Sequence, residues 1–190
     1  MGDGVGAHPN GRLPLPAGRV GHQVTADAGQ IVRRPLMSTI HVVLVQPEIH
    51  WNTGNAGRTC LATGAQLHLV RPLGFSLDQR EVKRAGLDYW EHVDPTVWPN
   101  WDTFERALPE LGEPWFFSAS ARRLLWDAPI GSNTSVVLVF GRETGGLSAD
   151  VHARYADRFL AMPIQSPRVR SLNLSTSVAV ALYEVLRQRR

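Results

Sequence analysis

The sequence predicts an α/β protein whose mainly parallel sheet is flanked by helices, and three observations lead to this prediction. Short runs of β-branched and other apolar residues recur along the chain, and such runs are typical of strands buried on both faces. They alternate with stretches that show helical periodicity or helix-capping residues, which is the pattern of βα units. Finally, 43% of the 190 residues are hydrophobic, which is enough for the core of a domain of ordinary size.

The first 36 residues differ in character from the rest of the chain. They are rich in Gly, Pro and Ala and show neither strand nor helix periodicity, so they cannot bury enough surface to offset the entropy of ordering. We therefore expect a disordered extension over 1–36 and a folded domain over 37–190. Met37 is interpreted as the biological start of the protein; the alternative is a flexible arm that touches RNA.

The folded part begins with a strand, a helix and a second strand. Ile40–Val45 is predicted to be a buried strand. In the loop that follows, Asn52 and Thr53 are residue types that cap helices, and the predicted helix runs from there to Gly64, where glycine suits the C-terminal stop. The next strand is predicted over Gln66–Val70.

The middle of the chain carries weaker signals. From the charge pattern and the apolar spacing we predict a short helix over 78–84, an edge strand over 90–94, an amphipathic helix over Trp101–Leu111 and a strand over 115–118.

A glycine-rich turn follows the most apolar strand of the chain. Five apolar residues over Val136–Phe140 lead into Gly141, then Gly145 and Gly146, and Ser148 is placed to cap a short helix. Open α/β sheets bind ligands where a buried strand ends in such a turn, because glycine allows close backbone approach. An ordinary βα turn is the alternative interpretation of this stretch alone.

The last predicted elements are a strand over 158–162, stopped by Pro163, and a long C-terminal helix capped by Asn173. The helix carries an apolar stripe at helical spacing, formed by Leu174, Val178, Leu182, Val185 and Leu186.

Composition limits the classes of function. Cys60 is the only cysteine and the seven histidines are scattered, so we expect no disulfide and no metal. The sequence shows neither a membrane-spanning run nor a signal peptide, and we expect a cytoplasmic protein. The formal net charge is +3, of which residues 1–36 carry +2, so a nucleic-acid partner would be held by local arginine patches.

Three segments together resemble the signature motifs of the SPOUT-class RNA ribose methyltransferases. They are Asn52–Thr53–Gly54–Asn55 with Arg58, Phe140–Gly141–Arg142–Glu143 with Gly145–Gly146–Leu147, and Pro163–Ile164 with Ser171–Leu172–Asn173–Leu174–Ser175. Their order and spacing agree with the family over residues 40–190. The short chain, together with Gln46–Pro47–Glu48–Ile49 and Arg84–Ala85–Gly86–Leu87–Asp88–Tyr89, looks like the branch that methylates the wobble ribose (cytidine or uridine) of tRNA.

The resemblance implies S-adenosylmethionine as the methyl donor, the tRNA anticodon stem-loop as substrate, a homodimer, and a trefoil knot in the C-terminal part of the fold. It implies that Ser118, Gly141, Met162, Ser171 and Leu172 bind the cofactor. It further implies a catalytic role for Arg58 and RNA handling by Arg170 and Tyr183. For Tyr183, packing at the dimer contact is the alternative.

Three other functions compete with this expectation. The same chemistry could act on ribosomal RNA or on another tRNA position, or the protein could be an RNA-binding relative whose activity has decayed. A non-catalytic nucleotide-binding module is disfavoured, because no Gly-Lys-Ser/Thr follows the glycines and the spacing G-x-G-x-x-G is absent.

Overall fold

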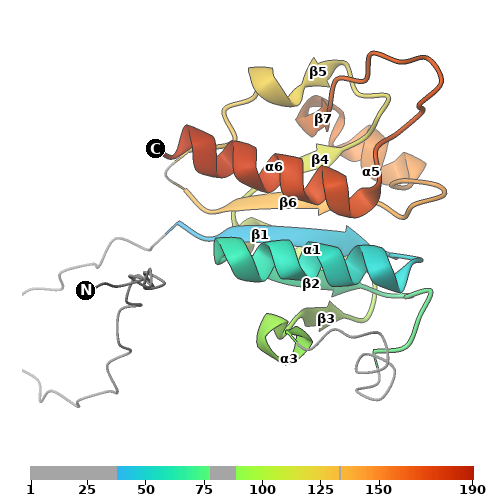
Figure 1. The fold of residues 1–190 in the computed structure, drawn as a ribbon, viewed down its shortest axis with the longest axis vertical. Helices are drawn as coiled ribbons and strands as arrows, with labels where there is room; N and C mark the ends of the chain where they lie inside the picture. Colours follow the sequence, from blue (N-terminus) through green and yellow to red (C-terminus); the bar gives the residue numbers. More distant parts are fainter. Residues whose placement is uncertain (1–37, 78–88, 133) are drawn as a thin grey trace, which may run out of the picture. The chain divides into compact units, whose positions relative to one another are not determined.

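Seven parallel strands form one sheet (Figure 1) in the computed structural model, which describes residues 38–77, 89–132 and 134–190. Every hydrogen-bonded strand pair is parallel, and the spatial order is β3-β2-β1-β6-β4-β7-β5. The strands are β1 (Ile40–Val45), β2 (Gln66–Val70), β3 (Thr96–Trp98), β4 (Glu113–Phe117), β5 (Arg123–Leu124), β6 (Val136–Phe140) and β7 (Phe159–Ala161).

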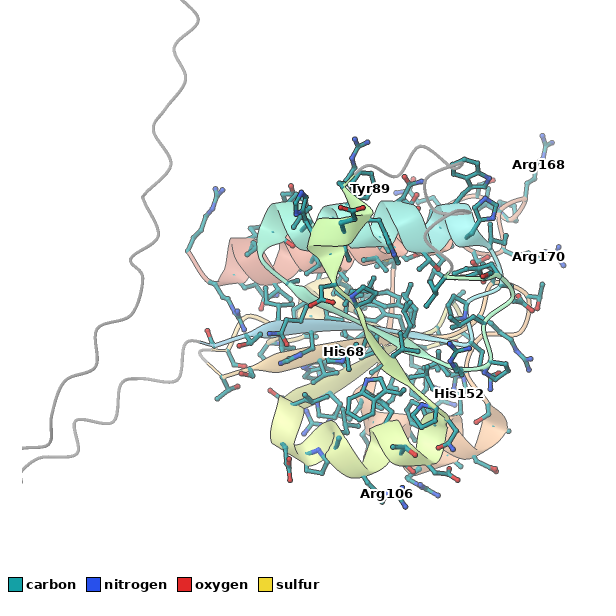
Figure 2. The ribbon with its side chains drawn as sticks, turned by 90° about the horizontal axis from the view of Figure 1, so that it is seen from below. His68, Tyr89, Arg106, His152, Arg168 and Arg170 are labelled. Atoms are coloured by element: carbon teal, nitrogen blue, oxygen red, sulfur yellow. The ribbon has the colours of Figure 1, made fainter. Side chains whose placement is uncertain are left out.

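Helices cover both faces of this sheet. The described helices are α1 (His50–Thr63), α3 (Trp90–Val93), α4 (Trp101–Leu111), α5 (Ala149–Arg154) and α6 (Leu174–Gln188), with 3-10 turns at Leu125–Asp127 and Ala156–Arg158. Figure 2 shows α1 and α6 side by side over one face, with α4 and α5 on the other. None of the described helices is long and apolar enough to cross a membrane.

The central strands are buried on both sides, as the apolar runs predict. In β1, Val42 and Leu44 belong to the core under α1 and α6, whereas Val43 and Val45 belong to the core under α4 and α5. Successive residues of a strand point to opposite faces, so a strand covered on both faces needs apolar residues at nearly every position. The predicted α/β class with a parallel sheet is thereby confirmed.

Several elements match their predicted bounds, and one predicted strand is a helix. β1, β2 and α4 have the predicted limits, and Gly64 ends α1 with a left-handed φ of 72°. The edge strand expected over 90–94 is instead the helix α3, and the edge strand β3 begins at Thr96. Trp90 and Val93 are three residues apart, a spacing that also suits one helical turn, and both pack against α1.

One further strand was not predicted, and one predicted helix cannot be compared with the structure. The two-residue strand β5 was not predicted, because a pair of residues gives no periodic signal. The helix expected over 78–84 lies outside the described residues.

The C-terminal end of α6 is tied to distant parts of the chain. Gln188 donates to the Ala128 carbonyl at 3.0 Å and accepts from the Gly131 N–H at 2.9 Å. Arg189 donates to the carbonyls of Ser38 and Thr134. These contacts fix α6 along its axis, which in turn fixes where its N-terminus lies.

Candidate active site

A cavity of about 550 Å³ lies at the carboxyl ends of β4, β6 and β7. Because these strands are parallel and adjacent, the loops that follow them meet at one edge of the sheet. The lining comes from the segment after β4 (Ser118, Ala119, Ser120), the glycine turn after β6 (141–146), the segment from Met162 to the first turns of α6, and Ile49 and Asn52 at the start of α1.

The lining has an apolar part and a polar part. Phe117 and Phe140, the last residues of β4 and β6, stack with ring centroids 4.4 Å apart and an interplanar angle of 9°. With Leu160 they form the apolar part, and the hydroxyls of Ser118 and Ser120 belong to the polar part. This volume and this mixed lining are typical of sites for small organic ligands.

The glycine turn depends on close approach of the backbone to itself. A Cβ atom on Gly141 would lie 2.2 Å from the carbonyl carbon of Gly146, and Gly146 has a positive φ of 63°. The Gly146 N–H donates to the Arg142 carbonyl at 2.9 Å, which closes the turn. Ser148 then caps α5 as predicted, accepting from the Val151 N–H.

Two glutamates lock the glycine turn to the loop before α1. The Glu143 carboxylate accepts from the backbone N–H groups of Glu48 (2.8 Å) and Ile49 (3.3 Å) and from the Asn52 amide (2.8 Å). In return, the Glu48 carboxylate accepts from the backbone N–H and the hydroxyl of Thr144. These hydrogen bonds favour the charged form and lower the pKa of Glu48.

Asn52 connects this pair of loops to α6. Its amide oxygen accepts from the Asn173 side chain at 2.8 Å, and Asn173 caps α6 as predicted by accepting from the Ser175 N–H. The expectation that Asn52 and Thr53 cap α1 is wrong, since that helix begins at His50 and has no side-chain cap. Asn52 is only 6% exposed, and its amide group is used for contacts between segments.

The linking roles of Glu48, Glu143 and Asn52 were not predicted from the sequence. Their presence within the matched segments was visible, but spacing along the chain gave no indication that they contact one another.

The predicted site residues fall into two groups. The five expected at the cofactor all line the cavity: Ser118, Gly141, Met162, Ser171 and Leu172. Arg58, Arg170 and Tyr183 do not line it. Arg58 lies on the exposed side of α1, and Tyr183 is 58% exposed on α6. Arg168 and Arg170 extend outward from the loop before α6 (Figure 2).

Histidines gather as a pair in the sheet, away from the cavity. His41 Nδ1 lies 2.9 Å from His68 Nε2, and the Trp98 indole donates to His68 Nδ1 at 3.1 Å. Since His68 Nδ1 accepts, the neutral ring carries its proton on Nε2 and donates it to His41. Within residues 38–77, 89–132 and 134–190, no three His, Cys, Asp or Glu side chains are grouped to hold a metal ion.

Comparisons with known proteins show what the chain is similar to. Residues 39–183 match the model of the SpoU rRNA Methylase family. A tRNA (cytidine(34)-2'-O)-methyltransferase from Methylovorus glucosotrophus is 42% identical over 147 residues, which is 77% of this chain and 94% of that protein.

Two solved structures have the same fold. One, described as giving structural insights into the 2-OH methylation of C/U34 on tRNA, is 45% identical with a TM-score of 0.72, and the match covers 81% of this chain and 97% of that one. An AdoMet-bound rRNA methyltransferase from Sinorhizobium meliloti is 25% identical with a TM-score of 0.65, covering 80% of this chain and 57% of that one.

Proposed function

This chain belongs to the SpoU rRNA methylase family, and on that premise we propose that it methylates the ribose 2'-hydroxyl of the wobble nucleotide in tRNA. The observation that carries the proposal is the similarity, above 40% identity and over more than 90% of their length, to proteins named for that reaction at nucleotide 34. The cavity with its apolar and polar lining supports a small-molecule methyl donor at the same site.

The donor proposed for this cavity is S-adenosylmethionine. Its chemical parts fit the residues present: a flat adenine ring suits the apolar lining, and ribose and amino-acid groups suit serine hydroxyls and backbone groups. We assign binding to Ser118, Gly141, Met162, Ser171 and Leu172. When bound, S-adenosylmethionine supplies an electrophilic methyl group on its sulfonium sulfur. The AdoMet-bound relative from S. meliloti supports this choice.

The remaining chemistry is the activation of the ribose hydroxyl, which we assign to Arg58. A guanidinium is not deprotonated in proteins, so Arg58 is not the base. Its N–H groups instead orient the target phosphate and stabilise the negative charge that develops on the 2'-oxygen. A phosphate oxygen of the RNA is a suitable acceptor for the departing proton.

Arg58 requires a second copy of the chain to act in this way. It does not line the cavity of its own chain, although Ile49, just before α1, and Asn52, in its first turn, do. We therefore propose a homodimer in which Arg58 of one protomer lies beside the cavity of its partner. Large side chains exposed on α1 and α6, Trp51 and Tyr183, support a contact through these helices.

Recognition of the RNA is assigned to a few arginines near the cavity. Arg142 lines the cavity, and Arg168 and Arg170 lie in the exposed loop before α6. Such a small number of phosphate contacts suits an anticodon loop, whose unstacked nucleotides present their sugars without melting a duplex. Tyr183 either assists this RNA contact or packs at the dimer interface.

The remaining proposals concern the bounds, the topology and the location of the domain. We propose that residues 37–190 form the methyltransferase domain, that its C-terminal part has the trefoil knot of the family, and that it works in the cytoplasm.

The test is to incubate the purified protein with S-adenosylmethionine and either whole tRNAs or an isolated anticodon stem-loop, then map ribose methylation by mass spectrometry. Methylation at the wobble nucleotide of both substrates is expected. Arg58→Ala is expected to reduce turnover by at least about 100-fold with cofactor affinity unchanged. Arg170→Ala is expected to weaken tRNA binding and leave cofactor binding intact.

Two outcomes would contradict the proposal in different ways. Methylation only at another tRNA position, or only on ribosomal RNA, would refute the substrate and leave the reaction class standing. Calorimetry that detects no binding of S-adenosylmethionine would refute the reaction class itself.

A further inference from the structure

The guanidinium of Arg58 lies over the ring of Tyr89. The distance from Arg58 Cζ to the ring centroid is 4.7 Å, which is within the range of a cation–π contact. Figure 2 shows Tyr89 beside the short helix α3, on the side of the molecule covered by α1. Among the described residues no carboxylate forms an ion pair with Arg58, and its guanidinium lies against the aromatic face of Tyr89.

Tyr89 is itself held against α1. Its hydroxyl donates to the Gly54 carbonyl at 3.1 Å, and in a regular α-helix that carbonyl also accepts the N–H of residue 58. The next residue, Trp90, packs over Gly57, where an added Cβ would lie 2.9 Å from the Trp90 ring. The missing side chain at Gly57 therefore lets α3 come close enough to α1 for the tyrosine ring to reach Arg58.

We propose that Tyr89 is a positioning residue that holds the Arg58 guanidinium in the orientation needed at the reacting ribose. This inference rests on the proposed role of Arg58 in stabilising the alkoxide. A free arginine on a helix surface samples many rotamers, and fixing it costs entropy. Stacking on the ring face restricts the guanidinium plane but leaves its edge N–H groups free to donate to phosphate and alkoxide oxygens.

A positioning role and a purely structural role of Tyr89 predict different effects when only its hydroxyl, or its whole ring, is removed. If the ring positions Arg58, Tyr89→Phe keeps the function, because the aromatic face remains. If Tyr89 only braces the backbone of α1, Tyr89→Phe and Tyr89→Leu are equally harmful, because both lose the hydrogen bond to Gly54.

The experiment compares these two variants in the full-length protein with whole tRNA as substrate. Tyr89→Leu is expected to reduce kcat by about 10- to 100-fold, with the Kd of S-adenosylmethionine unchanged, because a misplaced guanidinium affects the chemical step. Tyr89→Phe is expected to stay within about threefold of the natural protein. In an Arg58→Ala background, Tyr89→Leu is expected to add less than about twofold.

A second readout does not depend on activity. The NMR signal of the Arg58 Nε–H group, assigned by its loss in Arg58→Ala, is expected to carry a ring-current shift that Tyr89→Phe keeps and Tyr89→Leu removes.

Each contrary outcome points to one assumption. Full activity of Tyr89→Leu beside an inactive Arg58→Ala would overturn the positioning role, as would equal losses in Tyr89→Phe and Tyr89→Leu. Full activity of Arg58→Ala would instead overturn the proposed role of Arg58, and a natural protein that methylates no RNA would overturn the proposed function.

Discussion

At the scale of single residues, Asn52 shows how one side chain can hold a site together without touching the reaction. Its amide donates to Glu143 in the glycine turn and accepts from Asn173 at the start of α6. All three residues line the cavity, so the relative placement of its walls depends on this chain of hydrogen bonds. Without the Asn52 side chain, Glu143 and Asn173 each lose a hydrogen-bond partner, and a buried polar group without a partner costs free energy.

Asn52→Ala is expected to lower the affinity for S-adenosylmethionine about tenfold and to reduce the free energy of unfolding by about 1–3 kcal/mol. Asn52→Asp is expected to be worse, since it places a second carboxylate against Glu143. Asn55→Ala, an exposed position on the same helix, is the matched control. Calorimetric titration and thermal unfolding measure both effects, and an Asn52→Ala variant with normal cofactor affinity would show that the link is dispensable.

The buried histidine pair has a consequence for stability in acid. Burial lowers the pKa of His41, and burial together with the charge of His41 lowers the pKa of His68 to about 4. In the unfolded chain these rings have their ordinary pKa of about 6.5. Between about pH 6.5 and pH 4 the unfolded state therefore binds more protons, and stability is lost as the pH falls.

We expect the free energy of unfolding to fall by up to about 1.4 kcal/mol per pH unit from His68 across this range, with an additional fall below pH 6.5 from His41. The measurement is urea unfolding at a series of pH values. His68→Gln is expected to flatten the pH dependence, whereas His50→Gln, at an exposed position, serves as control. A stability that is constant from pH 6.5 to pH 4 would contradict the neutral, buried state of the pair.

At the scale of elements, the conformation of the glycine turn after β6 explains why glycine is needed in it. A Cβ at Gly141 would collide with the backbone of Gly146 and Leu147, so glycine is required there by the turn even before any ligand binds. At Gly145 the nearest obstacle is the flexible side chain of Arg142, at 2.9 Å. These two glycines therefore differ in how strictly they are needed.

Gly141→Ala is expected to destabilise the protein by more than about 1 kcal/mol and to abolish cofactor binding. The reason is that the turn must open to make room for the alanine side chain. Gly145→Ala is expected to retain both properties, since the Arg142 side chain can move aside. Thermal unfolding and calorimetry on both variants test the contrast. Equal behaviour of the two variants would mean that the turn tolerates a side chain at either position.

The same scale shows what the sequence could predict and why. β1, β2 and α4 were predictable from their apolar residues. A strand buried on both faces is apolar at nearly every position, and a helix buried on one face is apolar at helical spacing. The segment around Trp90 was not, because apolar residues three apart satisfy both a strand and a single helical turn. Asn52 was assigned to a cap by its residue type, whereas its contact with Asn173 joins positions 121 residues apart and leaves no local signal.

At the scale of the whole molecule, the position of Arg58 outside its own cavity gives the homodimer a testable function. An Arg58→Ala protomer has an intact cavity and lacks the arginine, and a Leu172→Arg protomer has the arginine and a blocked cavity. If the arginine acts across the interface, a mixed dimer contains one complete site. If it acts within one chain, a mixed dimer contains none.

Mixing equal amounts of the two inactive variants and allowing subunit exchange is therefore expected to restore about a quarter of the natural activity, since half the dimers are mixed and each has one site. Turnover on whole tRNA measures the recovery. Incubating each variant alone is the control, and the absence of recovery after confirmed exchange would contradict the shared site.

A truncated protein that begins at Met37 is expected to keep its cofactor affinity and its activity within about tenfold, which is about 1.4 kcal/mol in the barrier. The family match begins at residue 39, two residues after Met37. Kinetics on whole tRNA and on the stem-loop provide the test. A larger loss on whole tRNA alone would show that residues 1–36 work on the RNA.

The hydrogen bond between Asn52 and Asn173 also sets an order of events during synthesis. At about 5–20 residues per second, a ribosome needs about 6–24 s to reach the second asparagine after making the first. By the end of that interval α1 and the glycine turn have been made, but the wall of the cavity contributed by α6 does not yet exist. The ligand site is therefore incomplete until α6 has been made, and a nascent chain has no complete cavity to fill before that helix emerges.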